Sequence, residues 1–384
     1  MASRMNDFSL PQGLWLGRVW RAGIGPALVT IRADHVYDIT SKAAPTMRDL
    51  LELPDIAGFV ANIQGEDLGS YASLAAASVE AGADATRLLA PCDLQAIKAC
   101  GVTFARSMIE RVIEERAAGN PALAAEIRIR AAGVIGDSLR DLIPGSDKAA
   151  KVKSLLQAEG LWSQYLEVGI GPDAEVFTKA QPMAAVGYGA LVGLHPISKW
   201  NNPEPEVVLV VTSTGQIIGA TLGNDVNLRD VEGRSALLLG KAKDNNAAAS
   251  IGPLIRVFDD NFSLDTVRGL ELSLTVTGED GFLLQGHSSM RQISRDPADL
   301  VAQTRGRHHQ YPDGFVLYCG TMFSPVQDRV GPGQGFTHHL GDVVSISAPD
   351  LGVLTNTVRL STEAPEWQFG TGALMRNLAA RGLL

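Results

Sequence analysis

The feature that most constrains the fold is a pair of apolar runs that carries acidic residues at its ends. Glu204 and Glu206 are two residues apart, so on a β-strand their side chains point to the same face. The continuous apolar run 207–211 follows at once, as in a strand that is buried on both faces. After a short polar turn a second apolar run, 217–222, leads to Asp225. This pattern predicts two adjacent core strands that bring three carboxylates together.

Three carboxylates at one end of a sheet repel one another unless a positive group lies between them. Ligation by oxygen alone favours a hard cation such as Mg²⁺, Mn²⁺ or Ca²⁺. The alternative is that these residues are ordinary exposed acids at strand ends, because an E-x-E pair is a weak pattern by itself. The spacing does not decide between the two.

The segments that follow resemble the signature of the fumarylacetoacetate hydrolase superfamily. In that superfamily an E-x-E pair is followed by an N-D-x-x-x-R-D stretch, and then by a lysine ten residues before the proline of an I-G-P motif. Here residues 224–230 read N-D-V-N-L-R-D, and Lys243 precedes Pro253 by ten residues. Several separate motifs in the right order make the resemblance specific.

The resemblance covers most of the chain, and includes F-T-K at residues 177–179 and G-T at residues 320–321. It implies that Glu204, Glu206 and Asp225 hold a divalent metal, which we expect to be Mg²⁺ or Mn²⁺.

The resemblance also implies an α+β fold in two parts. Residues 14–40 alternate as short strands do, with glycine and proline at the turns. We therefore expect a small β-rich N-terminal domain at residues 1–90. A catalytic domain of the fumarylacetoacetate hydrolase type is expected at residues 91–384, with its strands in a mixed β-roll. Residues 103–117 have the period of an amphipathic helix, and residues 120–160 also read as helical.

One position departs from the hydrolases of the superfamily. They read roughly G-x-N-Y-x-x-H-x-x-E, where this chain reads G-V-T-F-A-R-S-M-I-E, so Ser107 takes the place of the histidine and Glu110 is kept. In the hydrolases that histidine and glutamate activate water, and a serine hydroxyl cannot act as a base near neutral pH. The departure favours a reaction in which water leaves. The alternative is that Ser107 and Glu110 lie on a solvated helix face.

Further segments resemble one branch of the superfamily, the 2-keto-3-deoxypentonate dehydratases. They are residues 160–167, 200–206, 243–246 and 309–314. The resemblance implies a hydro-lyase that converts 2-keto-3-deoxy-D-pentonate to 2,5-dioxopentanoate and water in oxidative pentose catabolism, such as xylose degradation. The main alternative is an acylpyruvase-type hydrolase that cleaves a carbon–carbon bond of a 2,4-diketo acid. A third is a catalytically silent protein that binds sugar acids.

Two residues are predicted to carry the chemistry, and the sequence leaves their roles open. Lys243 would neutralise the enolate of a 2-keto acid or act as the base, and Glu110 would act as the base or as the acid. The expected substrate-binding residues are Ser107, Lys179, Arg229 and Thr321. For Arg229, a structural ion pair with Asp230 or Glu232 is the alternative.

Composition limits the partners and the compartment. The net charge of −9 argues against nucleic acid and anionic membrane as partners. The three cysteines show no metal or disulfide spacing, which fits a reducing compartment. No run approaches a membrane span, and no secretory signal pattern is present. We expect a cytoplasmic homo-oligomer, a dimer or a tetramer, that acts on a small 2-keto acid.

Overall fold

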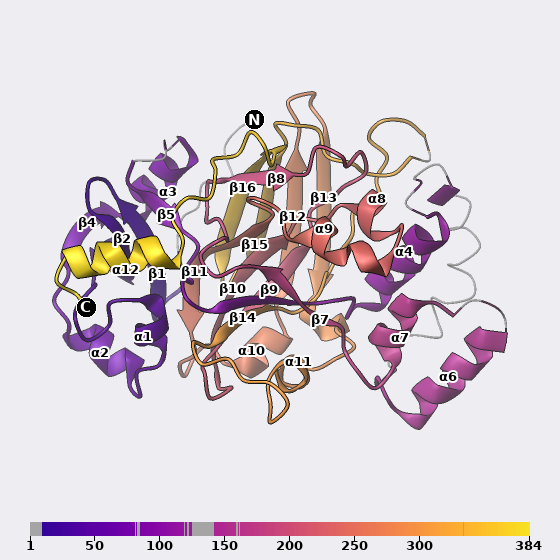
Figure 1. Ribbon diagram of the computed structural model, residues 1–384, viewed down its shortest axis with the longest axis horizontal. Helices are drawn as coiled ribbons and strands as arrows, with labels where there is room; N and C mark the ends of the chain where they lie inside the picture. The colour runs from indigo at the N-terminus through magenta and orange to yellow at the C-terminus, as the bar shows by residue number, and fades with distance from the viewer. Residues whose placement is uncertain are drawn as a thin grey trace.

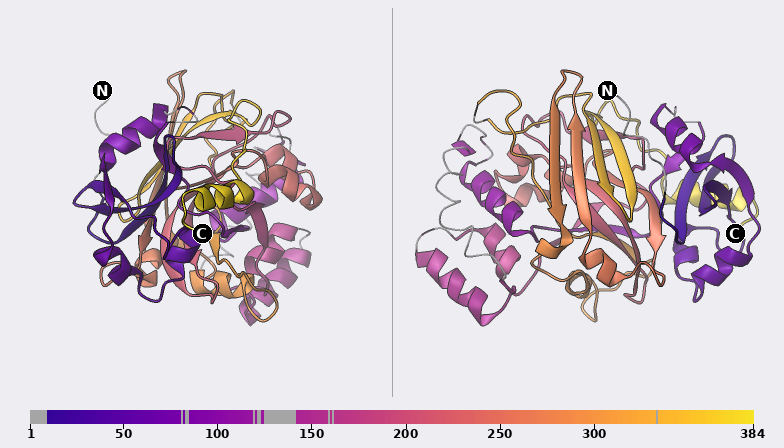
Figure 2. Two further views of the ribbon diagram at one scale, coloured as in Figure 1. Left: turned by 60° about the vertical axis from the view of Figure 1, so that its left-hand side comes forward. Right: turned by 180° about the vertical axis from the view of Figure 1, so that it is seen from behind.

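The computed structural model describes residues 10–80, 82, 85–118, 120, 123–124, 142–158, 160, 162–332 and 334–384. Two β-sheets occupy the middle of the molecule, the N-terminal strands lie at one end, and α4 (Ala105–Arg116), α6 (Asp147–Ala158) and α7 (Gln164–Ile170) lie at the other (Figure 1). Figure 2 shows the same arrangement from two further sides. This combination of mixed sheets and helices confirms the expected α+β class.

The larger sheet has eleven strands within the described residues. Ten follow one another across it: β4 (Glu66–Ser70), β3 (His35–Asp38), β2 (Gly25–Arg32), β1 (Trp15–Arg21), β11 (Ala249–Val257), β10 (Ile217–Asp225), β9 (Pro205–Val211), β14 (Phe315–Tyr318), β6 (Ala96–Cys100) and β7 (Val176–Ala180). The eleventh, β5 (Arg87–Leu89), pairs with β1. Because β1 also pairs with β11, the N-terminal strands continue the sheet of the C-terminal part. The domain boundary at residue 90 stays a prediction.

The smaller sheet has five strands, in the order β13 (Leu283–Ser289), β12 (Glu271–Thr277), β15 (Val343–Ala348), β16 (Gly352–Leu360) and β8 (Leu191–Leu194). One core cluster joins the two sheets, since it contains Val207 and Leu209 of β9 together with Leu274 of β12. The alternate residues of β9, Val208 and Val210, belong to a second cluster on the opposite face. Burial on both faces explains why the β9 run is apolar without a break.

The remaining helices are α1 (Met47–Leu51), α2 (Ile56–Asn62), α3 (Tyr71–Glu80), α8 (Arg229–Glu232), α9 (Leu239–Lys243), α10 (Leu264–Arg268), α11 (Pro297–Thr304) and α12 (Thr371–Ala380), with short 3₁₀ turns at Ala236–Leu238 and Met290–Gln292. The helix expected at residues 103–117 is confirmed as α4. The helical segment expected at residues 120–160 is confirmed in part by α6, and residues 125–141 lie outside the described residues. No described helix has both the length and the apolar character needed to cross a membrane.

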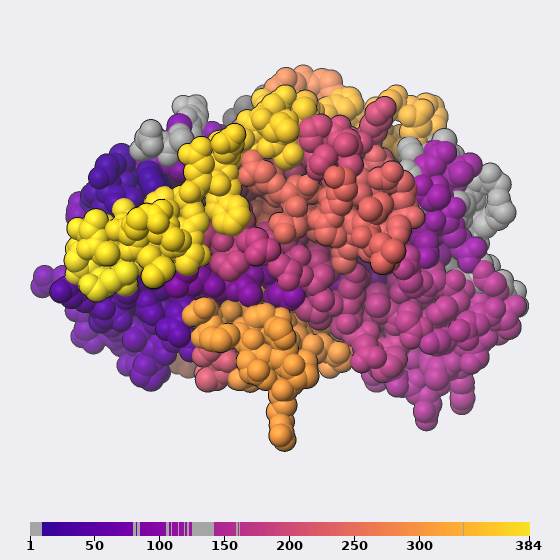
Figure 3. All heavy atoms as spheres, viewed as in Figure 1, coloured from indigo at the N-terminus to yellow at the C-terminus, as the bar shows by residue number. Residues whose placement is uncertain are grey.

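The C-terminal helix α12 packs on the N-terminal strands. The Asn377 side chain donates a hydrogen bond of 2.7 Å to the carbonyl oxygen of Ile24, and Arg381 donates one of 2.7 Å to that of Pro26. In Figure 3 the C-terminal residues, in yellow, cover part of the indigo N-terminal surface. The last residues of the chain therefore hold the β1–β2 hairpin against the rest of the fold.

Candidate functional site

The strand order brings five strand ends to one edge of the larger sheet. β6 and β14 run parallel and both end at this edge, next to Cys100 and Cys319. β9 is antiparallel to β14 and β7 is antiparallel to β6, so both begin there. β10 is antiparallel to β9 and ends there with Asp225. Residues that are distant in the sequence therefore meet at this edge.

The three carboxylates that the sequence singled out are brought together at this edge. The amide of Asp225 donates to the carbonyl oxygen of Glu204 at 3.0 Å, and Glu206 lies opposite Gly223 on the neighbouring strand. Each of Glu204, Glu206 and Asp225 offers a carboxylate oxygen, and these oxygens all lie within 4.8 Å of one another. Exposure of the three side chains is at most 1%. The alternative of exposed acids at strand ends is wrong.

Two lysines contact this carboxylate triad. The ammonium of Lys243 lies 2.6 Å from Oε2 of Glu204 and 3.0 Å from Oδ2 of Asp225. Lys179 lies 2.8 Å from Oδ1 of Asp225 and donates to the carbonyl oxygen of Lys243 at 2.6 Å. Burial opposes the charge of Lys243, but Asp225 and Glu204 raise its pKa above the ordinary value. Both lysines are thus fixed as parts of one buried charge cluster.

Arg111 of α4 and Glu232 of α8 complete this cluster. The Arg111 guanidinium pairs with the Glu204 carboxylate, and its Nη1 atom lies 3.2 Å from Oε2 of Glu232. The same Glu232 oxygen lies 3.9 Å from Nζ of Lys243. All four side chains are buried. Glu204 therefore pairs with two cations at once, and Glu232 is a second carboxylate near both of them.

Glu206 differs from the other two carboxylates, because it has no ion pair with a lysine or arginine of the described residues. It accepts hydrogen bonds from the amide of Gly320 at 2.6 Å and from Oγ1 of Thr321 at 3.5 Å. Burial raises the pKa of Glu206 well above its ordinary value, and the charges of Asp225 and Glu204 raise it further. A divalent cation would supply the missing positive charge, so the donor set fits a hard metal ion.

A cavity opens beside these charges. It is lined by Cys100, Gly101, Val102, Arg111, Tyr165, Glu175, Phe177, Glu204, Asp225, Lys243 and Thr321. Glu175 precedes β7, and burial followed by the charge of Glu232 raises its pKa to about 7. A carboxyl group with this pKa can accept or donate a proton near neutral pH.

Gly101 makes room for the Glu175 carboxyl group. A Cβ atom at Gly101 would lie 1.9 Å from Oε2 of Glu175, closer than any real contact. The Gly101 amide also donates to the carbonyl oxygen of Glu175 at 3.0 Å. Only glycine lets the carboxyl group occupy this position beside the cavity.

The Gly101→Ala variant should therefore displace the Glu175 carboxyl group. We expect kcat for the reaction proposed below to fall by roughly 10²-fold, the scale of a lost acid–base group, with little change in metal affinity. Steady-state kinetics and Mn²⁺ titration calorimetry would measure the two effects. An unchanged kcat would show that the position of Glu175 is not important.

Of the other residues expected at the site, Thr321 lines the cavity, whereas Ser107 and Arg229 do not. Ser107 donates a hydrogen bond of 2.7 Å to the carbonyl oxygen of Thr321. Arg229 donates to Oδ1 of Asn202 at 2.7 Å and lies over the ring of Trp200. Ser107 thus fastens α4 to the segment that carries Thr321.

Glu110 of α4 is buried, with 7% of its surface exposed, but it is not among the residues that line the cavity. Ser107 has no exposed surface. The alternative of a solvated helix face is therefore wrong. Arg111, the residue after Glu110, lines the cavity instead. The catalytic role of Glu110 stays a prediction.

The sequence reasoning missed Glu175, although a signal for it was present. The F-T-K resemblance placed Phe177 and Lys179 near the site, and alternate residues of a strand point to the same face. Glu175 is two residues before Phe177, so the same period places its carboxyl group on that face. The role of Arg111 was also missed, although the helical period puts it next to Ser107.

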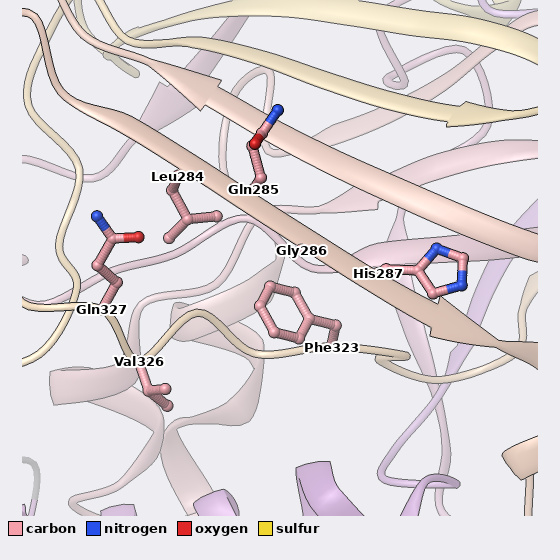
Figure 4. Close-up of a pocket in the computed structure, with 7 residues that line it drawn as sticks. All are labelled: Leu284, Gln285, Gly286, His287, Phe323, Val326 and Gln327. Carbon is pink, nitrogen blue, oxygen red and sulfur yellow. The ribbon is translucent and has the colours of Figure 1, made fainter.

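A second hollow lies beside β13, the edge strand of the smaller sheet (Figure 4). It is lined by Leu284, Gln285, Gly286, His287, Phe323, Val326 and Gln327. None of these is a carboxylate, so it lacks the ligand chemistry of the triad.

The metal site gives a direct test. Glu206→Gln keeps the shape of the side chain but removes one negative charge, so we expect Mn²⁺ or Mg²⁺ affinity to fall by at least roughly tenfold. Titration calorimetry on the purified protein would measure the change. Equal affinity in the variant and the parent would rule out Glu206 as a ligand.

Comparisons with known proteins agree with this geometry. Residues 171–359 match the family model described as fumarylacetoacetate (FAA) hydrolase C-terminal. The chain is 32% identical over 194 residues to a probable 2-keto-3-deoxyxylonate dehydratase from Haloferax volcanii. This alignment covers 50% of this chain and 63% of that protein. It is also 29% identical over 185 residues to a 2-dehydro-3-deoxy-D-arabinonate dehydratase from Saccharolobus solfataricus. This second alignment covers 48% of this chain and 58% of that protein. The matches thus span less than two thirds of these relatives.

The fold is shared with solved structures. One is a 2-keto-3-deoxy-D-arabinonate dehydratase complexed with magnesium and 2,5-dioxopentanoate, with a TM-score of 0.62 and 21% identity over 90% of this chain and 99% of that one. Another, with a TM-score of 0.53 and 19% identity over 90% of this chain and 98% of the other, is a 5-carboxymethyl-2-hydroxymuconate delta-isomerase from Mycobacterium smegmatis. These likenesses establish the architecture. Residues 171–359 resemble the C-terminal domain described by the fumarylacetoacetate (FAA) hydrolase family model.

Proposed function

We propose that the protein is a metal-dependent dehydratase that converts a 2-keto-3-deoxypentonate to 2,5-dioxopentanoate and water. The observation that carries the proposal is one buried cavity edge where an oxygen-only triad, Lys243 and Glu175 come together. The names of the two curated relatives and the magnesium and 2,5-dioxopentanoate complex support the same substrate class. Oxidative pentose catabolism is the pathway that we infer for it.

The triad Glu204, Glu206 and Asp225 would hold the metal. When bound there, a divalent cation supplies a Lewis acid that polarises the keto group of a 2-keto acid and acidifies its C3 protons. Arg111 and Lys243 also line the cavity, so once a divalent cation offsets the charge of the triad they would attract an anionic substrate.

The proton transfers are assigned to Glu175. Its carboxylate accepts a proton from C3, and Lys243 stabilises the negative charge that develops on the C2 oxygen. The proton on Glu175 then passes to the C4 hydroxyl group, which leaves as water when the C4–O bond breaks. One carboxyl group thus serves first as base and then as acid, and is regenerated.

The remaining step is an isomerisation. Loss of water leaves a double bond between C3 and C4 next to the C5 alcohol. Transfer of a proton from C5 to C3 moves the double bond to C4 and C5, and the resulting enol tautomerises to the aldehyde of 2,5-dioxopentanoate. Atoms and charge balance without a further reactant.

The alternative is an acylpyruvase-type hydrolase. The superfamily's hydrolases activate water with a histidine–glutamate pair, and Ser107 stands at the position of that histidine. The Ser107 hydroxyl donates its hydrogen bond to the carbonyl oxygen of Thr321. No histidine is found among the described residues that line the cavity. These observations favour dehydration.

The substrate panel tests this choice. With Mg²⁺ or Mn²⁺ present, we expect 2-keto-3-deoxypentonates to give 2,5-dioxopentanoate, measured by coupling the aldehyde to a nicotinamide-dependent aldehyde dehydrogenase. Acylpyruvates should not be cleaved appreciably. If acylpyruvate cleavage proved faster than aldehyde formation, the hydrolase would replace the dehydratase.

A further inference from the structure

The charge cluster contains more carboxylates than cations. Its buried carboxylates are Glu204, Glu206, Asp225 and Glu232, with Glu175 close by, whereas its cations are Lys179, Lys243 and Arg111. Among the described residues, three cationic side chains therefore face at least four carboxyl groups. The arrangement is suited to a further cation of charge two, but that cation must share Glu204 with groups that already use it.

Glu204, like Asp225, is held by two cations at once. One of its oxygens pairs with Arg111 and the other accepts a 2.6 Å hydrogen bond from Lys243. Both oxygens of Glu204 are therefore engaged by side chains. A metal ion that binds Glu204 competes with these two cations for its lone pairs, and a buried cation that is pushed away from Glu204 needs another partner.

Glu232 is placed to be that partner. Its Oε2 atom lies 3.2 Å from Arg111 and 3.9 Å from Lys243, the same two cations that hold Glu204. This oxygen is fully buried, yet it makes no hydrogen bond in the structure. A small shift of either cation toward Glu232 would bring it within full hydrogen-bond distance of this oxygen. The Glu232 carboxylate is thus a nearby acceptor that is not yet used in full.

We propose that Glu232 is a positioning residue that receives Arg111 and Lys243 when a divalent cation binds Glu204. The inference rests on the metal site of the proposed function and adds to it an exchange between two carboxylates. Glu232 would hold the two cations at the cavity wall, where the substrate needs them, while Glu204 becomes a metal ligand.

The exchange predicts opposite effects on metal affinity. Arg111→Met removes a competitor for Glu204, so Mn²⁺ should bind more tightly. Glu232→Gln removes the second acceptor and leaves both cations on Glu204, so Mn²⁺ should bind roughly tenfold more weakly, the lower end of the effect of outer-shell partners. Titration calorimetry of the full chain with Mn²⁺ alone measures both without any substrate.

The loss of one charge near the metal site would by itself strengthen Mn²⁺ binding in Arg111→Met and weaken it in Glu232→Gln. Two further variants distinguish this purely electrostatic field effect from the exchange. Glu232→Asp keeps the negative charge but shortens the side chain, so the exchange predicts weaker Mn²⁺ binding and a field effect predicts nearly parental binding. In the Arg111→Met background, the exchange predicts that Glu232→Gln has less than about a threefold effect, because the main partner is gone. A field effect predicts the same factor in both backgrounds.

The matched control is Asp230→Asn in the same helix. Asp230 accepts hydrogen bonds from Ser198 and Lys199 and contacts neither Arg111 nor Lys243 in the described structure, so its loss should leave Mn²⁺ affinity unchanged. Circular dichroism and thermal melting would show that each variant is folded, and Glu232→Asp replaces Glu232→Gln if the latter is not.

The outcomes are distinguishable. A parent protein that does not bind Mn²⁺ contradicts the metal-dependent function itself. A parent that binds Mn²⁺, with parental affinity in Glu232→Asp or equal effects of Glu232→Gln in both backgrounds, leaves the function standing and overturns the exchange.

Discussion

Replacement of Glu175 by glutamine should lower kcat by roughly 10²–10⁴-fold, the usual contribution of general acid–base catalysis. The amide keeps the size of the side chain and its place beside Gly101, but it can neither accept the C3 proton nor donate one to the C4 hydroxyl. Metal affinity and KM should change little, because Glu175 is not part of the triad. Steady-state kinetics with a 2-keto-3-deoxypentonate and Mn²⁺ calorimetry would measure these effects.

The pH dependence of kcat/KM shows which protonation state of Glu175 is the active one. The carboxyl group must be ionised to take the C3 proton, and its pKa is raised to about 7 by burial and by Glu232. The kcat/KM of the parent should therefore be full above this pKa and fall as the pH drops through it. Glu175→Gln should lose this limb. The matched control is Asp173→Asn, an exposed carboxylate two residues away, which should keep both rate and limb. A limb that persists in Glu175→Gln would contradict the assignment.

Much of the fold could be predicted from local patterns, because those patterns report burial. The unbroken apolar run of β9 and the short alternating runs of β1 and β2 are where the sequence predicted strands. The pairing of β1 with β11 could not be predicted, since it joins residues more than two hundred positions apart. No local period encodes such a long-range contact.

The site shows the same division. The triad could be predicted because Glu204, Glu206 and Asp225 lie on two strands joined by a short turn. Glu175 and Arg111 come from other elements, and only the strand order and the packing of α4 bring them to the cavity. The spacing offers Glu232 as a partner of Arg229, whereas the structure places it 3.2 Å from Arg111. Charge pairs between elements depend on tertiary packing, which spacing does not report.

Some expectations concern properties beyond a single chain. The dimer or tetramer and the cytoplasmic location remain predictions. Light scattering after size exclusion and fractionation of the producing cells would test them.

Lys243→Met should also have a large effect, because Lys243 lies between two carboxylates of the triad and lines the cavity. Methionine keeps most of the length of the side chain but has no charge. An interaction made mainly in the transition state is then lost, so kcat should fall by roughly 10²-fold or more while substrate still binds.

Mn²⁺ affinity should not fall in this variant, since a competitor for Glu204 is removed. Lys241→Met, an exposed position in the same helix, is the matched control and should behave like the parent. A Lys243→Met enzyme with nearly normal kcat and a much higher KM would show that Lys243 only anchors the substrate carboxylate. The charge on the C2 oxygen would then have to be stabilised by the metal without help from this ammonium group, and the assignment of Lys243 to the enolate would be wrong.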